Sequence, residues 1–118
     1  MAKTRMIEIA VQNRPGTVAA VTAALAQAGV NILSIFGWSP QGILQLIVDD
    51  PTKAAAALTA GKIGYTFADA EMVEMSDQPG SLHTYLAELA EKGVNLQSIS
   101  GSSGNAAGKS VLVWTAGT

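Results

Sequence analysis

The sequence contains no cysteine, a single histidine and few charged side chains. Of its 118 residues, 5% are aromatic and 14% are charged. Without cysteine, disulfides and thiolate metal sites are excluded, and the cytoplasm is the simplest location. One histidine, His83, cannot form a histidine-based metal cluster or a catalytic triad within one chain, so neither a metal site nor a catalytic site is predicted.

Long runs of one residue type are also missing. No uninterrupted apolar stretch reaches about 18 residues, so no transmembrane helix is expected. The first five residues lead into a strand-like segment without the apolar region of a signal peptide. Lysine and arginine do not cluster, and the formal net charge is −2, so neither nucleic acid nor a membrane is an expected partner. The 48% of hydrophobic residues is typical of a folded globular protein.

The sequence repeats itself at a spacing of 64 residues. Residues 13–18 (Asn-Arg-Pro-Gly-Thr-Val) recur as residues 77–82 (Asp-Gln-Pro-Gly-Ser-Leu), and residues 29–35 recur as residues 93–99. No gap is needed between the first and the last of these positions. Such self-similarity indicates a duplicated supersecondary unit, so function is expected in what both copies retain.

The apolar pattern predicts an alternation of strands and helices in the first copy. Strands are indicated by alternating or β-branched residues, and helices by apolar residues recurring at three and four. The predicted elements are a strand over residues 6–12, a helix over 18–28, strands over 30–39 and 43–48, a helix over 52–58 and a strand over 65–75. The last segment contains neither Gly nor Pro and is long enough to end one copy and begin the next without a linker.

The second copy follows the same order but is predicted to be incomplete. A helix over residues 82–90, strands over 94–99 and 110–114 and an intervening turn are expected, and adding 64 to Pro51 gives Thr115. This copy is therefore predicted to lack its last helix and strand. The expected fold is α+β: a ferredoxin-like βαββαβ unit over residues 1–69, then a truncated βαββ copy over residues 70–118, with antiparallel sheets and helices on one face.

The turn at residues 13–17 after a strand, with Gly-Val-Asn-Ile at 29–32, resembles the ACT domain, a small-molecule-binding regulatory module. The second copy matches the same pattern at residues 77–81 and 93–96. The resemblance implies amino-acid binding at an interface between paired domains. It also implies that asparagines hold the ligand at the positions of Asn13 and Asn31, as in the serine-binding members of the family, where a histidine stands in place of Val11.

The residues themselves suit a ligand with a carboxylate and an ammonium group. A helix N-terminus exposes N–H groups, glycine permits close approach, and asparagine offers both donors and an acceptor. The predicted ligand-binding residues are Asn13, Arg14, Pro15, Gly16, Thr17, Asn31, Ile32, Asp77, Gln78, Gly80, Ser81, Asn95 and Leu96. The alternative is structural: Asn13 and Asp77 cap the helices that they precede, and Asn31 and Asn95 follow helix ends as turn residues.

Three functions are compatible with these features. We expect a regulatory protein without a cofactor and without enzymatic activity, which binds a free amino acid or similar small carboxylate and acts on an amino-acid-metabolism enzyme. The alternatives are a ligand-free interaction module and an acylphosphatase-like hydrolase in which Arg14 holds phosphate. Arg14 against Gln78 predicts that the first copy binds carboxylates better.

Three further expectations concern assembly and packing. The apolar surface left open in the second copy predicts an obligate homodimer or higher oligomer. Residues 104–110 approach a phosphate-binding loop but have the wrong spacing and precede a strand, so a hairpin tip is predicted there. Phe36 and Trp114 are expected to be packing residues.

Overall fold

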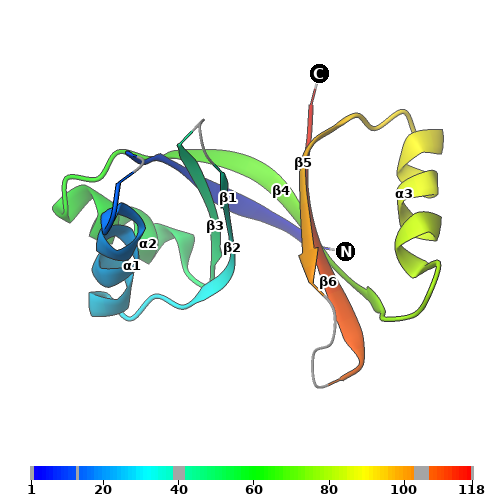
Figure 1. The fold of residues 1–118 in the computed structure, drawn as a ribbon, viewed down its shortest axis with the longest axis horizontal. Helices are drawn as coiled ribbons and strands as arrows, with labels where there is room; N and C mark the ends of the chain where they lie inside the picture. Colours follow the sequence, from blue (N-terminus) through cyan, green and yellow to red (C-terminus); the bar gives the residue numbers. More distant parts are fainter. Residues whose placement is uncertain (1, 13, 39–41, 103–106, 118) are drawn as a thin grey trace. The chain divides into compact units, whose positions relative to one another are not determined.

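A computed structural model describes residues 2–12, 14–38, 42–102 and 107–117 of the chain. The fold is α+β, with antiparallel strand pairing (Figure 1). The chain divides into two compact units: a first unit, Arg5–Ala68, and a second unit, Met1–Thr4 with Asp69–Thr118. In chain order the elements are β1 (Ala2–Ala10), α1 (Thr17–Gln27), β2 (Ile32–Trp38), β3 (Ile43–Val48), α2 (Pro51–Ala60), β4 (Thr66–Ser76), α3 (Ser81–Glu91), β5 (Leu96–Ser102) and β6 (Lys109–Ala116).

The strands of the first unit follow one another across the sheet in the order β2-β3-β1-β4. Ile7 of β1 lies opposite Leu46 of β3, and Ile35 of β2 lies opposite the same leucine from the other side. Together with the helix positions, this order is that of a ferredoxin-like βαββαβ unit. The predicted fold class is confirmed.

Both helices of the first unit pack on one face of its sheet. The buried cluster joins α1 and α2 to alternate residues of β1 and β3, because alternate side chains on a strand share a face. Its members are Ile7, Ile9, Val21, Leu25, Val30, Leu44, Leu46, Val48, Ala54 and Leu58. None of the helices in the described part of the chain has the length and apolar character needed to cross a lipid bilayer.

The ends of these helices form as their sequences predict. Gly29 follows α1 with a φ of 74°, a conformation that glycine adopts without strain. Asp50 caps α2 by accepting a hydrogen bond from the Lys53 backbone N–H at 3.1 Å, and Pro51 takes the first helical position. Local sequence therefore determines where both helices of the first unit stop or start.

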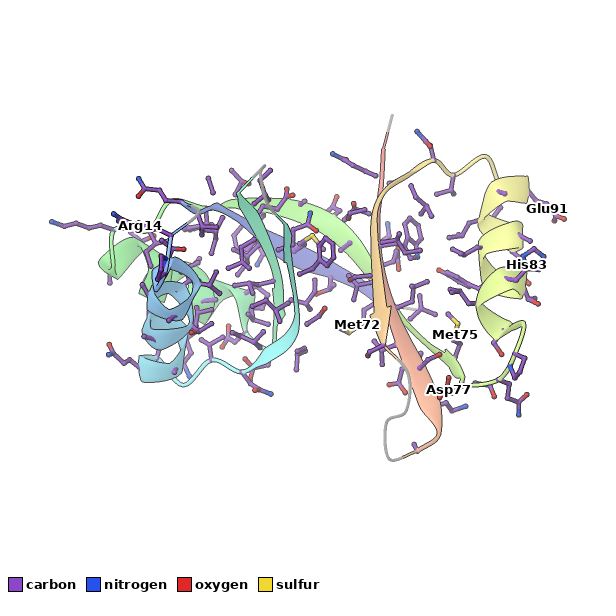
Figure 2. All side chains as sticks on the ribbon, viewed as in Figure 1. Arg14, Met72, Met75, Asp77, His83 and Glu91 are labelled. Carbon is purple, nitrogen blue, oxygen red and sulfur yellow. The ribbon has the colours of Figure 1, made fainter. Side chains whose placement is uncertain are left out.

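The second unit carries one helix, α3, on the strand order β4-β6-β5. Leu89 of α3 forms a buried cluster with Leu112 and Trp114 of β6, and Met75 of β4 packs against it (Figure 2). The indole N–H of Trp114 donates to the Tyr85 hydroxyl at 2.8 Å, which satisfies its single donor inside the cluster. Trp114 is a packing residue, as predicted from the sequence.

The two hairpins have the same construction but different lengths. Each has a bulge, at Ile32–Ser34 in the first and at Leu96–Ser98 in the second. Ile32 pairs with Val48, whereas Leu96 pairs with Ala116, so the offset between copies grows from 64 to 68 residues along the hairpin. The second hairpin is four residues longer. The offset of 64 applied to Pro51 in the sequence analysis therefore does not hold beyond the turn.

The surface that a second helix would cover in the second unit is not the bare apolar surface that the sequence analysis expected. Glu71 of β4 lies opposite Trp114, on the face that carries the α3 cluster, because directly paired residues share a face. Glu71 is half-buried and Asp69 is exposed. The position equivalent to Glu71 in the first copy is Ile7, which is fully buried. At Glu71 a carboxylate thus takes the place of a core residue of the first copy.

Candidate ligand-binding pockets

The loop between β1 and α1 is held by hydrogen bonds of its own. The Arg14 backbone N–H donates to the Gln12 carbonyl at 2.9 Å. The hydroxyl of Thr17 lies 2.8 Å from the Gln12 carbonyl and 3.1 Å from the Arg14 carbonyl, either of which can accept its proton. Gly16 completes the turn at a φ of 88°, a left-handed conformation. Thr17 therefore has a structural role in this loop, whatever else it contacts.

The loop between β4 and α3 repeats this backbone. The Gln78 N–H donates to the Ser76 carbonyl at 2.9 Å, and the Ser81 N–H donates to the Gln78 carbonyl at 3.2 Å. Gly80 takes a φ of 89°. The repeated sequence positions thus give the same turn twice, each placing the following helix in the same way on its strand.

Neither helix that follows these turns has a side-chain cap. The N-cap residues of α1 and α3 are Gly16 and Gly80, and neither cap position carries a side-chain hydrogen bond. Asp77 lies three residues before the N-cap of α3 and is exposed, so the alternative that it caps this helix is wrong. Asn13 lies outside the described residues. An uncapped N-terminus leaves N–H groups and a partial positive charge available to a carboxylate.

A pocket lies beside each of these turns. Pocket one has a volume of about 490 Å³ and is formed by the β1–α1 loop, the start of α1 and the facing parts of β2 and β3. Pocket two, of about 400 Å³, is formed in the same way by the β4–α3 loop, α3, β5 and β6. Both volumes are in the range of small-ligand sites. Eight pairs of residues related by the 64-residue offset line them: Val11 and Met75, Gln12 and Ser76, Arg14 and Gln78, Thr17 and Ser81, Val18 and Leu82, Ile35 and Ile99, Phe36 and Ser100, and Gly37 and Gly101.

The apolar walls of these pockets are exposed to solvent. Val18 and Ile35 are 39% and 49% exposed in pocket one, and Leu82 and Ile99 are 48% and 41% exposed in pocket two. Phe36 is among the residues of pocket one and is 38% exposed. Large apolar side chains that stay exposed at equivalent places in both copies indicate a surface kept for contact.

Glycine closes the far wall of each pocket. A Cβ on Gly37 would lie 3.2 Å from the Leu44 Cδ1 atom, and a Cβ on Gly101 would lie 3.2 Å from the Leu112 Cδ1 atom. A side chain at either position would therefore press against the leucine of the neighbouring strand. The sequence analysis missed these glycines and the exposed walls. The signal that could have revealed them is the 64-residue repeat itself, which extends to Gly37 and Gly101.

The structure divides the predicted ligand-binding residues of the first copy into two groups. Arg14 and Thr17 line pocket one, and Figure 2 shows Arg14 at the start of α1. Pro15 and Gly16 line an adjoining hollow on the other side of the loop. Asn31 lies after the C-terminal end of α1, and an 11-residue helix of about 16 Å separates it from the loop. The structure does not bring Asn31 to pocket one of its own unit.

Asn31 is held through its backbone at that distant end. Its N–H donates to the Asp49 carboxylate at 3.0 Å, and its carbonyl accepts from the Asp49 N–H at 3.0 Å. Ile32 pairs with Val48 in the hairpin. Asn31 is thus exposed, with its backbone held in place. This is consistent with the predicted turn role and also with contact to a second molecule of this chain.

The second copy shows the same division. Asp77, Gln78 and Ser81 line pocket two, whereas Gly80 shapes the turn. Asn95 lies beyond α3, where its carbonyl accepts from the Gly117 N–H at 2.6 Å, and Leu96 pairs with Ala116. The loop residues of each copy are therefore assembled into one pocket, and the asparagines after each helix are not.

Two features set aside in the sequence analysis add no site. His83 is exposed and projects from the side of α3 that faces away from the strands (Figure 2). The segment that approaches a phosphate-binding loop is only partly described, since residues 103–106 lie outside the described ranges. It leads into strand β6, as predicted, which begins at Lys109, one residue before the predicted start. Among the described residues, no group of three or more His, Cys, Asp or Glu side chains could hold a metal ion.

Solved structures of other proteins have the same fold. A protein from Bacteroides thetaiotaomicron, BT0572, superimposes with a TM-score of 0.86 at 25% identity over 98% of this chain and 81% of that one. The ligand-free regulatory subunit of aspartate kinase from Thermus thermophilus gives 0.68 at 18% identity over 98% and 88%. Aspartokinase III from E. coli, in complex with lysine and aspartate, gives 0.60 at 12% over 97% and 28%.

At 18% and 12% identity, the similarity to the two aspartokinase structures shows a shared fold and no more. Among curated proteins, no relative matches the chain. The family model of the ACT domain matches residues 5–60, which span β1, α1, the first hairpin and α2. That range contains pocket one and the turn that shapes it, and the second unit repeats both. The first unit therefore matches the ACT domain family, over residues 5–60 of this chain.

Proposed function

We propose that this chain is a regulatory protein that binds a free amino acid, or a similar small carboxylate, in pockets one and two. The observation that carries the proposal is that the same pocket is built twice, each time beside an uncapped helix N-terminus. The ligand carboxylate is expected at the backbone N–H groups in the first turn of α1 or of α3 that have no partner within the loop. A role in ligand binding rather than in catalysis is part of the proposal, as is the cytoplasmic location inferred from the cysteine-free sequence.

The solved structures support a regulatory output. One neighbour is described as the regulatory subunit of aspartate kinase, and another is an aspartokinase in complex with lysine and aspartate. By analogy, ligand binding here changes conformation or assembly and acts on an enzyme of amino-acid metabolism. Asn31 and Asn95 are proposed to contribute to a pocket of a second molecule of this chain, because each lies far from the pocket of its own unit.

A screen of the twenty amino acids by thermal shift tests this function. At millimolar concentrations, a ligand present at 100 times its Kd should raise the free energy of unfolding by about 2.7 kcal/mol. We expect at least one amino acid to raise the melting temperature in proportion to the logarithm of its concentration. A flat response across all twenty would instead favour the ligand-free interaction module.

Self-association is the second part of the proposal. Exposed apolar side chains lie on the edge strands β2 and β5: Leu33, 52% exposed, on β2 and Ile99 on β5. Light scattering at micromolar concentration should give at least twice the chain mass of 12.1 kDa. Leu33→Lys should lower that mass, since a lysine on an edge strand opposes pairing. Gln97→Lys, at the equivalent position of β5, tests the other edge strand in the same way. A stable 12.1 kDa species for the unaltered chain would contradict self-association.

A further inference from the structure

The edge strand of each pocket has a glycine where a side chain would be expected. Gly37 lies in β2 and lines pocket one, and Gly101 lies at the equivalent place in β5 and lines pocket two. Glycine weakens a strand, because it loses much conformational freedom on folding and has no side chain to pack. The same unfavourable residue in both copies therefore needs a cause other than the stability of the strand.

The backbone at these two positions does not require glycine. Neither Gly37 nor Gly101 takes a left-handed φ. Each is paired with a leucine of the neighbouring strand in regular register, since the bulges lie nearer the start of β2 and β5. The conformation at both positions is therefore open to residues that have a side chain.

The protein itself fills little of the space over the two glycines. Both Gly37 and Gly101 are exposed. In each case the nearest neighbour of an added Cβ would be the Cδ1 atom of the paired leucine, the flexible end of a side chain, at 3.2 Å. A carbonyl oxygen of the same strand follows, at 3.4 Å from a Cβ on Gly37 and at 3.2 Å from one on Gly101. A shift of a few tenths of an ångström would thus admit a methyl group.

Folding alone favours a larger residue at this position. Gly37 shares the helix-covered face of the sheet with Ile35, because the two are two residues apart and Gly37 lies opposite Leu44 of the buried cluster. Val18 and Ile35, which line the same pocket, stay 39% and 49% exposed. An apolar side chain at position 37 would cover part of this surface, and β-branched residues suit a strand. The same argument holds for Gly101 in the second copy.

We propose that the missing side chain at Gly37 and Gly101 determines which ligands the two pockets accept. With its carboxylate at the helix N-terminus, the ligand places its side chain over the glycine, against the exposed apolar residues of the pocket. Glycine within a strand often marks a place where a ligand approaches the backbone closely. The ligand class is therefore an amino acid whose side chain is larger than a methyl group. The inference rests on the proposed function and names the residue that limits the size of the ligand.

Adding one methyl group to each glycine in turn tests this inference. In NMR titrations with each of the twenty amino acids, the Thr17 amide reports pocket one and the Ser81 amide reports pocket two. Gly37→Ala should weaken binding at Thr17 by at least about tenfold for side chains larger than methyl, because the added methyl group takes their space. Binding of free glycine and L-alanine at Thr17, and all binding at Ser81, should stay nearly unchanged.

Two further variants are the matched controls. Gly101→Ala should have the opposite pattern, with weaker binding at Ser81 and unchanged binding at Thr17. Gly64→Ala should change binding at neither reporter, because Gly64 is exposed, lies outside pockets one and two and has open space where its Cβ would be.

The ligand-free variants test whether the neighbouring leucine is instead the reason for the glycines. Gly37→Ala should keep the melting temperature of the unaltered chain, since the gain from replacing a strand glycine offsets a small shift of Leu44. A lower melting temperature with unchanged amino-acid binding would mean that Gly37 only makes room for Leu44, and the inference would be wrong.

The remaining outcomes separate this inference from the function on which it rests. If large amino acids bind the alanine variants as tightly as the unaltered chain, or if only free glycine and L-alanine bind the unaltered chain, the size limit is wrong and amino-acid binding stands. If Gly37→Ala lowers the mass in light scattering but leaves amino-acid binding unchanged, the space takes a side chain of a second molecule instead. If none of the twenty shifts either reporter, the proposed function fails as well.

Discussion

Replacing Ile7 with glutamate should unfold the first unit. Ile7 is fully buried and packs in the cluster that holds Leu25 and Leu46, so its side chain has no solvent and no polar partner within that cluster. Burying an unpaired charge there should cost more than about 5 kcal/mol, which is comparable to the whole stability of a small domain. Circular dichroism and amide hydrogen exchange of β1 and β3 should show the loss of the unit.

The equivalent position of the second copy supplies the control. Glu71 already occupies it, half-buried, so Glu71→Ile should change the free energy of unfolding by less than about 1 kcal/mol. The two variants exchange the same pair of residues in opposite directions. Equal effects of both on urea denaturation would mean that the absence of a covering helix does not explain why this position differs between the copies.

Truncating Leu25 and Leu89 should have large but unequal effects. The two leucines are equivalent in the repeat, and each anchors its helix on a sheet. Leu25→Ala should lower the free energy of unfolding by about 3–5 kcal/mol, because α1, α2, β1 and β3 all contribute buried residues around the cavity that it leaves. Leu89→Ala should cost nearer to about 2 kcal/mol, since one helix covers its smaller cluster and can shift into the space.

Separate measurements for each unit make that comparison. Hydrogen exchange of the Leu112 and Trp114 amides reports the second unit, and that of the Ile7 and Leu46 amides reports the first. Denaturation of each variant by urea should give a larger decrease for Leu25→Ala in the first unit than for Leu89→Ala in the second. A larger loss for Leu89→Ala than for Leu25→Ala would contradict this prediction. It would show that the cluster under the single helix α3 adjusts less to a cavity than the cluster of the first unit.

Most of the fold could be predicted from the sequence because its signals are local. Gly29 and Asp50 mark helix ends through backbone conformation and one hydrogen bond, both determined by a few neighbouring residues. The unbroken strand β4 follows from a stretch without Gly or Pro. The repeat then transfers each of these assignments to the second copy.

Other features depend on the partner strand and could not be predicted in this way. The second hairpin is four residues longer, which becomes evident only from the pairing of Leu96 with Ala116. The pocket walls were missed because Ile35 and Phe36 have the composition of buried strand residues, and exposure is set by the absence of a neighbouring strand. Asp77 was weighed as a helix cap by residue type, but Gly80 takes that position because the Pro-Gly turn places the helix start three residues later.

Strand β4 runs from Thr66 to Ser76 across the boundary between the units, and β1 crosses the same boundary near its start. No linker separates the two units, since β4 belongs to both. Proteolysis at the boundary, or division of the gene there, would therefore split a strand that both units need. Neither half could then be inherited, exchanged or fused to another protein by itself. The two units together are therefore the smallest part of this protein that can be transferred intact.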